Sequence, residues 1–392
     1  MNTKQYDSYI AVGDWLQQRD QPVAITLTEI LEPSGGPGSV IFPPTYARRG
    51  GDHPYAISVF RSDLPPEAAA AQGLEANICD LDSVGAQANR MEPAFAEPPL
   101  NSLVAQRVIK AGPATVNLLQ IGHRVADGAV RFSALADGAT KAIAALAVQG
   151  DATALARLAP TSLIFGFWDS RDSQFKCPRI VNSTIRATNV AVLKRSAQFN
   201  PAFDPAALDL AEAADLHSAP AQEEKDPLSQ EGLRAAPAVD THGGVRVFGR
   251  ITRRTEINLV TLRSVAVVKA GKLDGAETLK LRRYLLGLSL VAGRVQNAYN
   301  LRQGCLLVPV AEPAPSAQVV LPSGQRQPFA WEFGPGYEFA EAAAKEFEVW
   351  SKDPVAEEFA FQSDKVKGAL KAKTEEKAAK KAAKEAKKKS AG

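Results

Sequence analysis

His123 and Asp127 lie four residues apart and are the residues whose types best suit acid–base catalysis. An imidazole and a carboxylate held close together can accept and donate a proton during a reaction. Gly122 and Gly128 flank the pair, and glycines in such positions are typical of a turn between strands. We therefore expect a turn here rather than a catalytic helix, and we assign no catalytic residue.

The sequence also lacks the patterns that bind metals or nucleotide phosphates. Asp80 and Asp82 suggest a magnesium site by their spacing, but Asp82 is better explained as a helix N-cap. The histidines at positions 53, 123, 217 and 242 have no metal-ligand spacing to one another or to a cysteine. No glycine-rich phosphate loop occurs. We predict neither a metal nor a cofactor.

A group of polar residues suits the backbone of a nucleic acid instead. The segment DSVGAQANRMEP at 82–93 predicts a short helix that ends at Pro93. Ser83, Gln87 and Arg90 share one face of this helix. Their hydroxyl, amide and guanidinium groups suit phosphate and sugar oxygens, which fix the register of a nucleic acid without reading its sequence. A solvated polar face is the alternative interpretation.

A second candidate surface lies at 245–254, where apolar and basic residues alternate. The pattern predicts a strand with one apolar and one basic face. The residues of the basic face that we assign to nucleic-acid binding are Arg246, Phe248, Arg250 and Arg254. Bases stack on an aromatic ring while guanidinium groups hold phosphates, which is what a single-stranded nucleic acid needs. Arginines that serve only solubility would give the same pattern.

A third basic region lies within 161–200. Two strand-like runs are joined there by a polar, turn-like connection from Asp169 to Pro178. The residues of this region that we assign to nucleic-acid binding are Arg171, Lys176, Arg179 and Arg186. Such a connection suits a projecting element that clamps a strand, although ordinary hairpins have similar sequences.

Strands and helices alternate along the chain and must position these groups. Strand patterns occur at 22–29, 54–60, 101–133, 161–200 and 245–268. Helical patterns occur at 134–149, 276–299 and 339–350. Prolines and a charge cluster predict a flexible surface insertion over 201–243. Because the elements do not repeat as βαβ units, the pattern favours an α+β fold.

The distribution of charge matters more than the net charge of +3. Of the 46 basic and 43 acidic side chains, 11 lysines and three glutamates lie within 365–392, so residues 1–364 carry 35 basic and 40 acidic side chains. Any surface of this slightly acidic body that binds nucleic acid must therefore be local. The lysine-rich tail at 365–392 has no apolar face, and we expect it to be solvated and at most marginally helical.

Composition indicates an ordinary globular protein. Hydrophobic residues make up 45% of the chain and charged residues 23%, so a core can form without disulfides or metal. Three widely separated cysteines argue against a disulfide framework. No signal peptide or membrane-spanning run is evident, and we expect a cytoplasmic protein.

Four motifs together resemble a known family. They are IFPPTYA at 41–47, DSVGAQANRMEP at 82–93, SLIFGFWDS at 162–170 and RIVNSTIRATNV at 179–190. Their order and spacing are similar to those of the RAMP-superfamily backbone protein of type I-G CRISPR systems, formerly called I-U. The resemblance covers residues 20–310 and leaves out the insertion after Asn200 and the lysine-rich tail.

The resemblance implies a ferredoxin-like (RRM-related) palm with inserted finger and thumb elements. Residues 1–200 would form the first part of the palm with its insertions, 201–243 the flexible insertion, 244–364 the rest of the palm and C-terminal helices, and 365–392 the tail. Several copies would stack head to tail along a CRISPR RNA in a heterologous filament.

The resemblance also implies a function. In similar proteins the first palm helix grips RNA, which corresponds to Ser83, Gln87 and Arg90, and a later strand adds contacts that suggest Arg179, Arg186 and Asn189. The chain would be a non-enzymatic CRISPR RNA-binding backbone subunit of a type I effector (Cascade) complex that supports binding of target DNA and contacts other Cascade subunits. A metal-independent endoribonuclease of the same superfamily that processes CRISPR RNA, with His123 as its catalytic residue, is the alternative.

Overall fold

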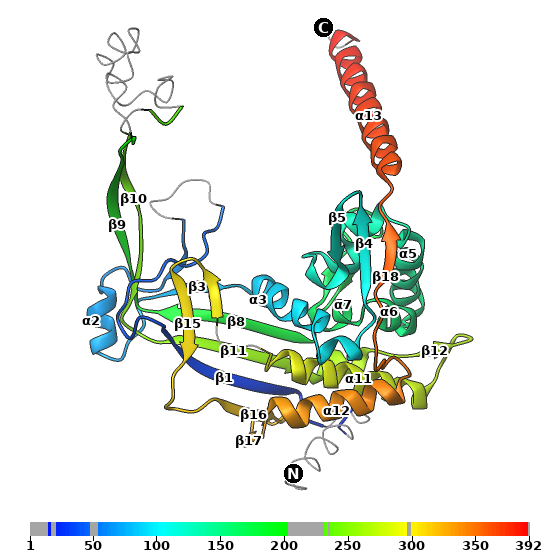
Figure 1. The fold of residues 1–392 in the computed structure, drawn as a ribbon, viewed down its shortest axis with the longest axis horizontal. Coiled ribbons are helices and arrows are strands. Elements are labelled where there is room, and N and C mark those ends of the chain that lie inside the picture. The colour runs from blue at the N-terminus through cyan, green and yellow to red at the C-terminus, as the bar shows by residue number, and fades with distance from the viewer. Residues whose placement is uncertain are drawn as a thin grey trace.

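The computed structural model describes residues 15–16, 21–47, 54–202, 231–233, 236–295 and 299–390, and an antiparallel β-sheet lies at its centre (Figure 1). Four of its strands are β1 (Ala24–Pro33), β8 (Val181–Thr188), β11 (Ile251–Asn258) and β15 (Cys305–Pro309). They lie in the order β15-β1-β11-β8, and each neighbouring pair is antiparallel. Helical segments connect β1 to β8, and α11 (Gly275–Ala292) connects β11 to β15. This is the split βαβ arrangement of ferredoxin-like folds, and it confirms the expected α+β class.

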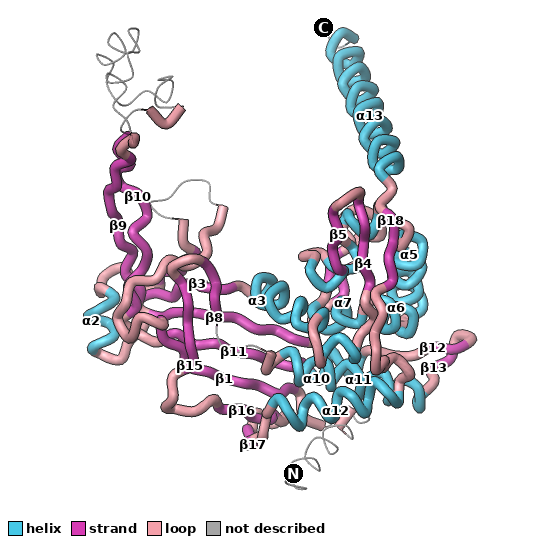
Figure 2. Tube along the Cα trace, viewed as in Figure 1, coloured by secondary structure: helices cyan, strands magenta, loops and turns pink. Residues whose placement is uncertain are grey.

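Further strands extend the sheet at its edges. Beyond β8 lie β3 (Asn77–Asp82) and β2 (Ala56–Val59), and beyond β15 lies β14 (Tyr299–Arg302). The other end of β1 pairs with β16 (Ser316–Val320), which pairs in turn with β17 (Arg326–Pro328). The short helix α2 (Pro66–Ala71) follows β2, with Pro65 as its N-cap and Pro66 as its first residue. Figure 2 shows β1, β11 and β8 running side by side, with β15 turned across them.

Helices pack against one face of this sheet. They are α3 (Val84–Met91), α7 (Pro160–Phe165), α10 (Leu259–Ser264), α11 and α12 (Phe333–Glu346). The helical pattern at 276–299 rests on an apolar stripe of Leu281, Leu285, Leu288, Ala292 and Val295, of which the first four are fully buried in α11 and Val295 is half-buried beyond its end. The sequence placed the end of this helix at 299, whereas α11 ends at Ala292.

A smaller sheet and a group of short helices lie beside this layer. The sheet consists of β18 (Glu357–Ala360), β4 (Arg107–Ala111) and β5 (Ala114–Asn117). The helices are α4 (Gly128–Arg131), α5 (Ala136–Ala144) and α6 (Thr153–Leu158), and a π-helical turn at 145–149 extends α5. The predicted helix at 134–149 is thereby confirmed.

The prediction of strands throughout 101–133 is wrong for most of that range. After β5 the chain forms 3₁₀ turns at Leu118–Gln120 and Arg124–Ala126, followed by α4. Apolar residues one to four positions apart fit a single helical turn as well as a strand, so short segments of this kind are ambiguous. Asp127 caps α4 by accepting a hydrogen bond from the Ala129 amide at 2.9 Å, which is a structural role.

The prediction of a strand over TSLIFGFWDS at 161–170 is also wrong in its first half. Pro160 occupies the first turn of α7, where its missing amide hydrogen costs nothing. Gly166 ends the helix with a φ of +70°, and the chain then enters β6 (Phe167–Trp168), which pairs with β7 (Lys176–Cys177). The polar connection between them is a turn, as predicted.

Between β8 and β11 the chain forms a long antiparallel hairpin. Its strands are β9 (Val190–Phe199) and β10 (Ala236–Val247), and it projects from one end of the sheet (Figure 1). Residues 236–243 therefore belong to a strand and not to the flexible insertion predicted for 201–243. Residues 203–230 of that insertion lie outside the described part of the chain.

The strand predicted across 245–254 is divided into two. A turn at 248–250 separates β10 from β11, and the Arg250 amide donates to Thr188 Oγ1 at 3.1 Å. A Cβ on Gly249 would lie 2.3 Å from that hydroxyl oxygen, so the turn requires glycine. A second small hairpin, β12 (Val268–Lys269) and β13 (Lys272–Leu273), precedes α11.

The tail forms a helix, α13 (Ser363–Ser390), where the sequence predicted marginal helicity at most. Alanine, lysine and glutamate dominate this segment and are all strong helix formers, which explains the difference. Across the described helices, none combines the length and apolar character that a membrane-spanning helix needs.

A buried polar network joins the helices to the sheet. Arg253 on β11 is fully buried, and its Nη1 lies 2.5 Å from Glu29 Oε2 on β1. The same guanidinium donates to Gln87 Oε1 on α3 at 3.1 Å, to the Gly293 carbonyl at 3.0 Å and to Tyr299 Oη at 3.1 Å. Four separate elements are thus tied to one side chain.

Replacing Arg253 with methionine tests this network. R253M leaves the Glu29 carboxylate buried with Arg294 as its remaining ion-pair partner, and we expect a loss of about 3–5 kcal/mol in the free energy of unfolding. The control R254M changes the next residue, which is exposed on the opposite face of β11, and should cost less than about 0.5 kcal/mol. Urea unfolding of both variants measures the difference, and equal losses would contradict a central role for Arg253.

Candidate nucleic-acid interface

The polar face predicted for α3 points into the protein. Gln87 is fully buried, donates to Asp82 Oδ2 at 2.6 Å and accepts from Ser183 Oγ at 2.9 Å. Ser83, and not Asp82, is the N-cap of α3, because its hydroxyl accepts from the Ala86 amide at 3.3 Å. Both predictions for these residues, an exposed Gln87 and an Asp82 cap, are wrong.

Arg90 is also engaged by the protein. Its Nε lies 3.0 Å from Asp82 Oδ2, and its terminal nitrogens donate to the carbonyls of Asn300 and Leu301 at 3.1 and 2.7 Å. Burial raises the pKa of Asp82, while Gln87 and Arg90 act in the opposite direction. Arg90 therefore fastens α3 to β14.

Two further predicted contacts have structural partners. Asn189 is buried with a φ of +53°, and its amide group bonds the Ala76 amide and the Leu74 carbonyl at 2.8 Å each. It holds the turn between β8 and β9, so the structure gives this predicted contact residue a structural role inside the protein. Arg186 is half exposed and pairs with Asp80 at 2.7 Å.

The base of the β9–β10 hairpin carries three of the remaining predicted residues. Arg246 and Arg250 are exposed, and the Arg246 guanidinium lies 5.1 Å from the centre of the Phe248 ring. Farther along the hairpin, Arg195 stacks in the same way on Phe42 at 5.2 Å. The aromatic and basic groups are thus adjacent as predicted, but they occupy a hairpin and its turn rather than one strand face.

A cleft of about 540 Å³ brings two other predicted residues together. It lies where α3, the 124–126 turn and the β6–β7 hairpin meet. Its lining residues are Gly85, Asn89, Gly122, His123, Arg124, Gly166, Phe167, Trp168, Lys176, Cys177 and Arg179. Cationic and aromatic side chains are both present, and none of these residues is an aspartate or a glutamate.

Trp168 forms an exposed aromatic surface at this cleft. Its side chain is 52% exposed, and the Lys176 ammonium lies 4.7 Å from the centre of its ring. The two residues are direct partners in the β6–β7 ladder. Burial alone would raise the pKa of Asp169, but hydrogen bonds from Ser173 and neighbouring amides lower this pKa below its usual value. The bonds from Ser173 also keep the turn between β6 and β7 closed.

Arg179 is held at the opposite side of the cleft. Its Nε donates to the Phe165 carbonyl at 2.9 Å, and no hydrogen bond from its terminal nitrogens is found within the described residues. A Cβ on Gly166 would lie 2.7 Å from Arg179 Cγ, so glycine at 166 leaves the space for this side chain. The protein therefore holds the guanidinium through its Nε, whereas its terminal nitrogens remain available to a ligand.

A buried ion pair forms the floor of the cleft. Arg124 Nε lies 2.7 Å from Glu92 Oε2, and its Nη1 and Nη2 donate to the Gly166 carbonyl and to Asn89 at 3.2 Å each. Burial raises the pKa of Glu92 to about 7, although Arg124 and Thr161 act against the rise. Burial also lowers the pKa of Arg124, and the nearby positive charge of Arg179 lowers it further. Because Glu92 balances the charge of Arg124, the positive charge that remains for an anion in the cleft comes from Lys176 and Arg179.

The sequence analysis did not select Trp168, Asn89 or Arg124 as site residues. The sequence did contain a signal for Trp168, because an aromatic residue directly before a charged turn is rarely part of the core. Arg171 lies in that turn and is exposed, but it does not line the cleft. His123 does line it, beside Gly122.

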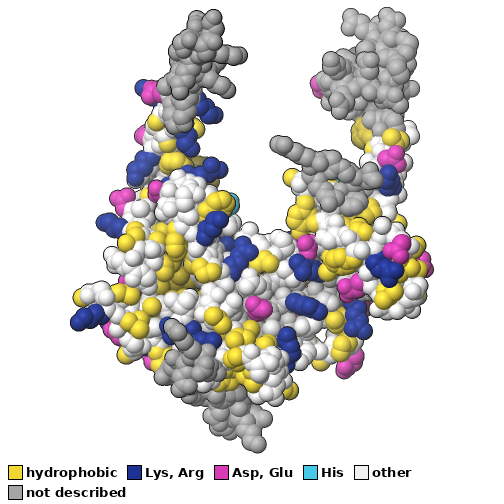
Figure 3. Space-filling view, turned by 180° about the vertical axis from the view of Figure 1, so that it is seen from behind, with side chains coloured by type: hydrophobic (Ala, Val, Ile, Leu, Met, Phe, Trp, Pro, Cys, Tyr) yellow, Lys and Arg dark blue, Asp and Glu magenta, His cyan; other side chains and the backbone are white. Residues whose placement is uncertain are grey.

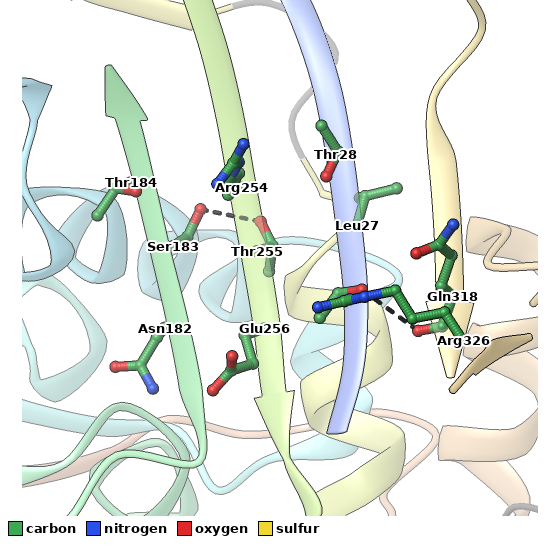
Figure 4. A pocket seen from close by; sticks show the side chains of 11 residues that line it. Leu27, Thr28, Asn182, Ser183, Thr184, Arg254, Thr255, Glu256, Gln318 and Arg326 are labelled. Atoms are coloured by element: carbon green, nitrogen blue, oxygen red, sulfur yellow. Dashed lines mark hydrogen bonds between the residues drawn. The ribbon is translucent and has the colours of Figure 1, made fainter. Parts of the chain in front are cut away.

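Arg254 lies on the other face of the sheet, away from this cleft. There it lines a hollow of about 480 Å³ with Glu256 on the same strand, Asn182 and Thr184 on β8, and Arg326 on β17 (Figure 4). Threonine hydroxyls and amides cover most of this face, and no aromatic residue lines the hollow. It therefore cannot stack bases, and the structure separates Arg254 from Lys176 and Arg179.

On the face seen in Figure 3, the basic side chains of the described residues do not merge into one large surface. Figure 3 shows Lys and Arg interspersed with Asp and Glu and with many uncharged side chains. Among the described residues, no group of three or more His, Cys, Asp or Glu could hold a metal ion. The cleft combines an exposed aromatic ring, unopposed cations and a helix N-terminus at Gly85, and this combination suits a single-stranded nucleic acid.

Comparison with known proteins connects this region to a family. Residues 25–192 match the family model described as CRISPR-associated protein GSU0053. Every residue that lines the cleft falls within the matched range, whereas β10, β11 and α11 lie beyond it. No curated protein matches the chain. The family match supports a role for this protein in a CRISPR system.

Replacing Trp168 with alanine tests whether the cleft holds single-stranded nucleic acid. Because the ring is exposed, W168A should leave the unfolding temperature nearly unchanged. Loss of one base stacked on the ring should weaken binding of single-stranded RNA by about 1–3 kcal/mol, or roughly 5- to 150-fold. Fluorescence anisotropy with a labelled oligonucleotide measures the affinity. The control F333A removes a partly exposed aromatic ring from α12, and an equal effect there would exclude the cleft.

Proposed function

We propose that this protein is a CRISPR RNA-binding backbone subunit of a type I effector (Cascade) complex, most similar to that of type I-G systems. The observation that carries the proposal is the cleft of Trp168, Lys176 and Arg179, which has no lining carboxylate and lies within the part of the chain that matches a CRISPR-associated family.

The chemistry of the cleft suits a guide RNA because it recognises groups common to every nucleotide. The Trp168 ring stacks on a base of any identity, and Lys176 and Arg179 attract phosphates. No set of side chains in the cleft is arranged to read base edges in a duplex. The sequence of the target would be read by pairing with the guide, and the subunit would hold the guide in register.

Several copies would follow one guide. A surface that binds the nucleic-acid backbone without sequence preference can bind at every equivalent interval along a strand. Successive copies of the subunit would therefore stack head to tail along the guide. The β9–β10 hairpin extends from the sheet with the exposed basic residues Lys194, Arg195 and Arg246. It can reach beyond its own subunit toward the strand held by the next copy.

We propose no enzymatic activity for the backbone subunit. Cutting of target DNA would belong to a separate nuclease-helicase of the complex. A second candidate function rests on His123, which lines the same cleft beside Gly122 and could serve a metal-independent endoribonuclease that processes CRISPR RNA.

Expression of the full chain beside a CRISPR array tests the proposal. We expect RNA of uniform guide length to copurify, together with protein oligomers in a constant ratio to RNA. R179Q should reduce the salt dependence of guide binding by about 0.7 in the slope of log K against log salt, since one phosphate contact is lost. Purification of the protein without RNA would contradict the proposal.

The same preparation distinguishes the two candidate functions. A backbone subunit binds repeat RNA without cleaving it, and H123A leaves the length of the copurifying RNA unchanged. Cleavage of repeat RNA in the absence of metal, abolished in H123A, would establish the endoribonuclease instead.

A further inference from the structure

The hollow around Arg254 lies on a face of the central sheet that the guide cleft does not use. Along β8 and β11 every second side chain is buried against the helices, and those between them are half-buried or exposed on the other face. The hollow on that face measures about 480 Å³, within the range of about 300–1,000 Å³ that is typical of small-ligand sites. It is therefore large enough for a group the size of one nucleotide.

Most of the polar side chains that line the hollow have no partner within the described part of the protein. No side-chain hydrogen bond or ion pair with a described residue is found for Thr28, Asn182, Thr184, Arg254, Glu256, Gln318 and Arg326. By contrast, Ser183 and Thr255, which face the helices, bond each other through their hydroxyls at 2.9 Å. The hollow thus presents donors and acceptors that remain available to a ligand.

Arg254 and Arg326 reach the hollow from opposite sides. Their strands are separated in the order β11-β1-β16-β17, which is three strand spacings, or about 14 Å in a flat sheet. Both side chains are exposed, and Figure 4 shows Arg326 extending from β17 toward β1 and β11. An anion in the hollow can therefore lie between two guanidinium groups, which bind phosphates and carboxylates strongly.

Glu256 narrows the kind of anion that fits. It lies two residues after Arg254 on the same face of β11, so two rows of side chains cross the hollow about 7 Å apart. One row contains Thr28, Arg254 and Thr184, and the other contains Thr26, Glu256 and Asn182. The first row attracts an anion, whereas the carboxylate of the second repels anions and accepts hydrogen bonds from hydroxyl groups. The hollow therefore suits a ligand that carries an anionic group beside a hydroxyl group.

A ribose–phosphate unit has this combination, and the alternatives lack part of it. In RNA the phosphate and the 2′-hydroxyl are carried by the same sugar, so they can occupy adjacent rows. DNA lacks the hydroxyl, an acidic peptide places further carboxylates beside Glu256, and an uncharged sugar leaves both arginines without an anion. No aromatic side chain lines the hollow, so the base would point away from it.

We propose that the hollow binds the ribose–phosphate backbone of an RNA strand, with Arg254 and Arg326 on a phosphate and Glu256 accepting from the 2′-hydroxyl. Binding there distinguishes RNA from DNA and does not read sequence. This recognition does not depend on the cleft, whereas the guide as the source of the RNA rests on the proposed function. The cleft would hold RNA by stacking and charge, and the hollow would hold it by charge and the 2′-hydroxyl.

Short oligonucleotides that differ only in the 2′-hydroxyl test the proposal. The probes are labelled hexamers of uridine and of deoxyuridine. The protein is the full chain carrying W168A and K176Q, which weaken the cleft, and it is freed of nucleic acid at high salt before use. Fluorescence anisotropy over a series of salt concentrations gives the affinity and its salt dependence.

Loss of both arginines should weaken binding of the uridine hexamer. R254Q together with R326Q should reduce the affinity about tenfold or more, and the slope of log K against log salt should fall by about 0.7 because one phosphate contact is lost. The control K141Q with K352Q removes equal charge from two exposed lysines outside the hollow and should change both quantities much less. Equal losses in the two variants would overturn the proposal, because total charge would then explain binding.

E256A tests recognition of the hydroxyl. The hollow should prefer the uridine hexamer to the deoxyuridine hexamer, and E256A should reduce this preference about fivefold, since the 2′-hydroxyl loses its acceptor. The control E75A removes an exposed carboxylate outside the hollow and should leave the preference as it is. An unchanged preference in E256A would overturn the assignment to RNA. Tighter binding of free ribose 5-phosphate than of the hexamer would overturn the strand in favour of a small sugar phosphate.

Folding and the proposed function are measured separately. Because the three charged side chains of the hollow are exposed, their variants should keep the unfolding temperature of the parent chain. R326Q alone changes only β17, which pairs with β16, and it keeps the test decisive if the double variant unfolds. Absence of copurifying guide RNA from the wild-type chain would contradict the proposed function while leaving the comparison of the hexamers interpretable.

Discussion

Arg253 carries its charge into the interior beneath α3, and a charge in that position must be neutralised and hydrogen-bonded for the fold to be stable. Glu29 neutralises it, and Gln87, Tyr299 and the Gly293 carbonyl complete its hydrogen bonds. These partners come from β1, α3, β14 and the end of α11. The network therefore fixes how α3 lies on the sheet, and α3 in turn contributes Gly85 and Asn89 to the cleft.

This constraint divides the residues of the motif at 82–93 into two groups by position. Asp82, Gln87 and Arg90 are used to hold α3 in place, while Gly85 and Asn89 reach the cleft. The cations of the cleft that remain available to a ligand are those without a carboxylate partner, namely Lys176 and the tip of Arg179. The proposed binding of nucleic acid thus depends less on the number of basic residues than on which of them the fold leaves without a carboxylate partner.

The sequence was sufficient for the α+β class, most of the central strands and the apolar stripe of α11, because these depend on periodicity. It was insufficient where a polar side chain can face either water or a buried partner. Glutamine and asparagine usually face solvent, so the sequence gives no sign that Gln87 and Asn189 are buried. Their hydrogen-bond partners Ser183, Arg253 and Ala76 are far away in the sequence and become neighbours only in the fold. The cleft was partly predicted through Lys176 and Arg179, whereas Trp168 and Arg124 required the turn at Gly166 and the β6–β7 pairing to be known.

Ultraviolet crosslinking of the copurified RNA to the protein, with the crosslinked peptides identified by mass spectrometry, tests the central claim most directly. The account predicts crosslinks to the β6–β7 hairpin, at Trp168 and its neighbours, and at a regular interval along the RNA. Crosslinks confined to the opposite sheet face around Arg254, with none in the cleft, would contradict it.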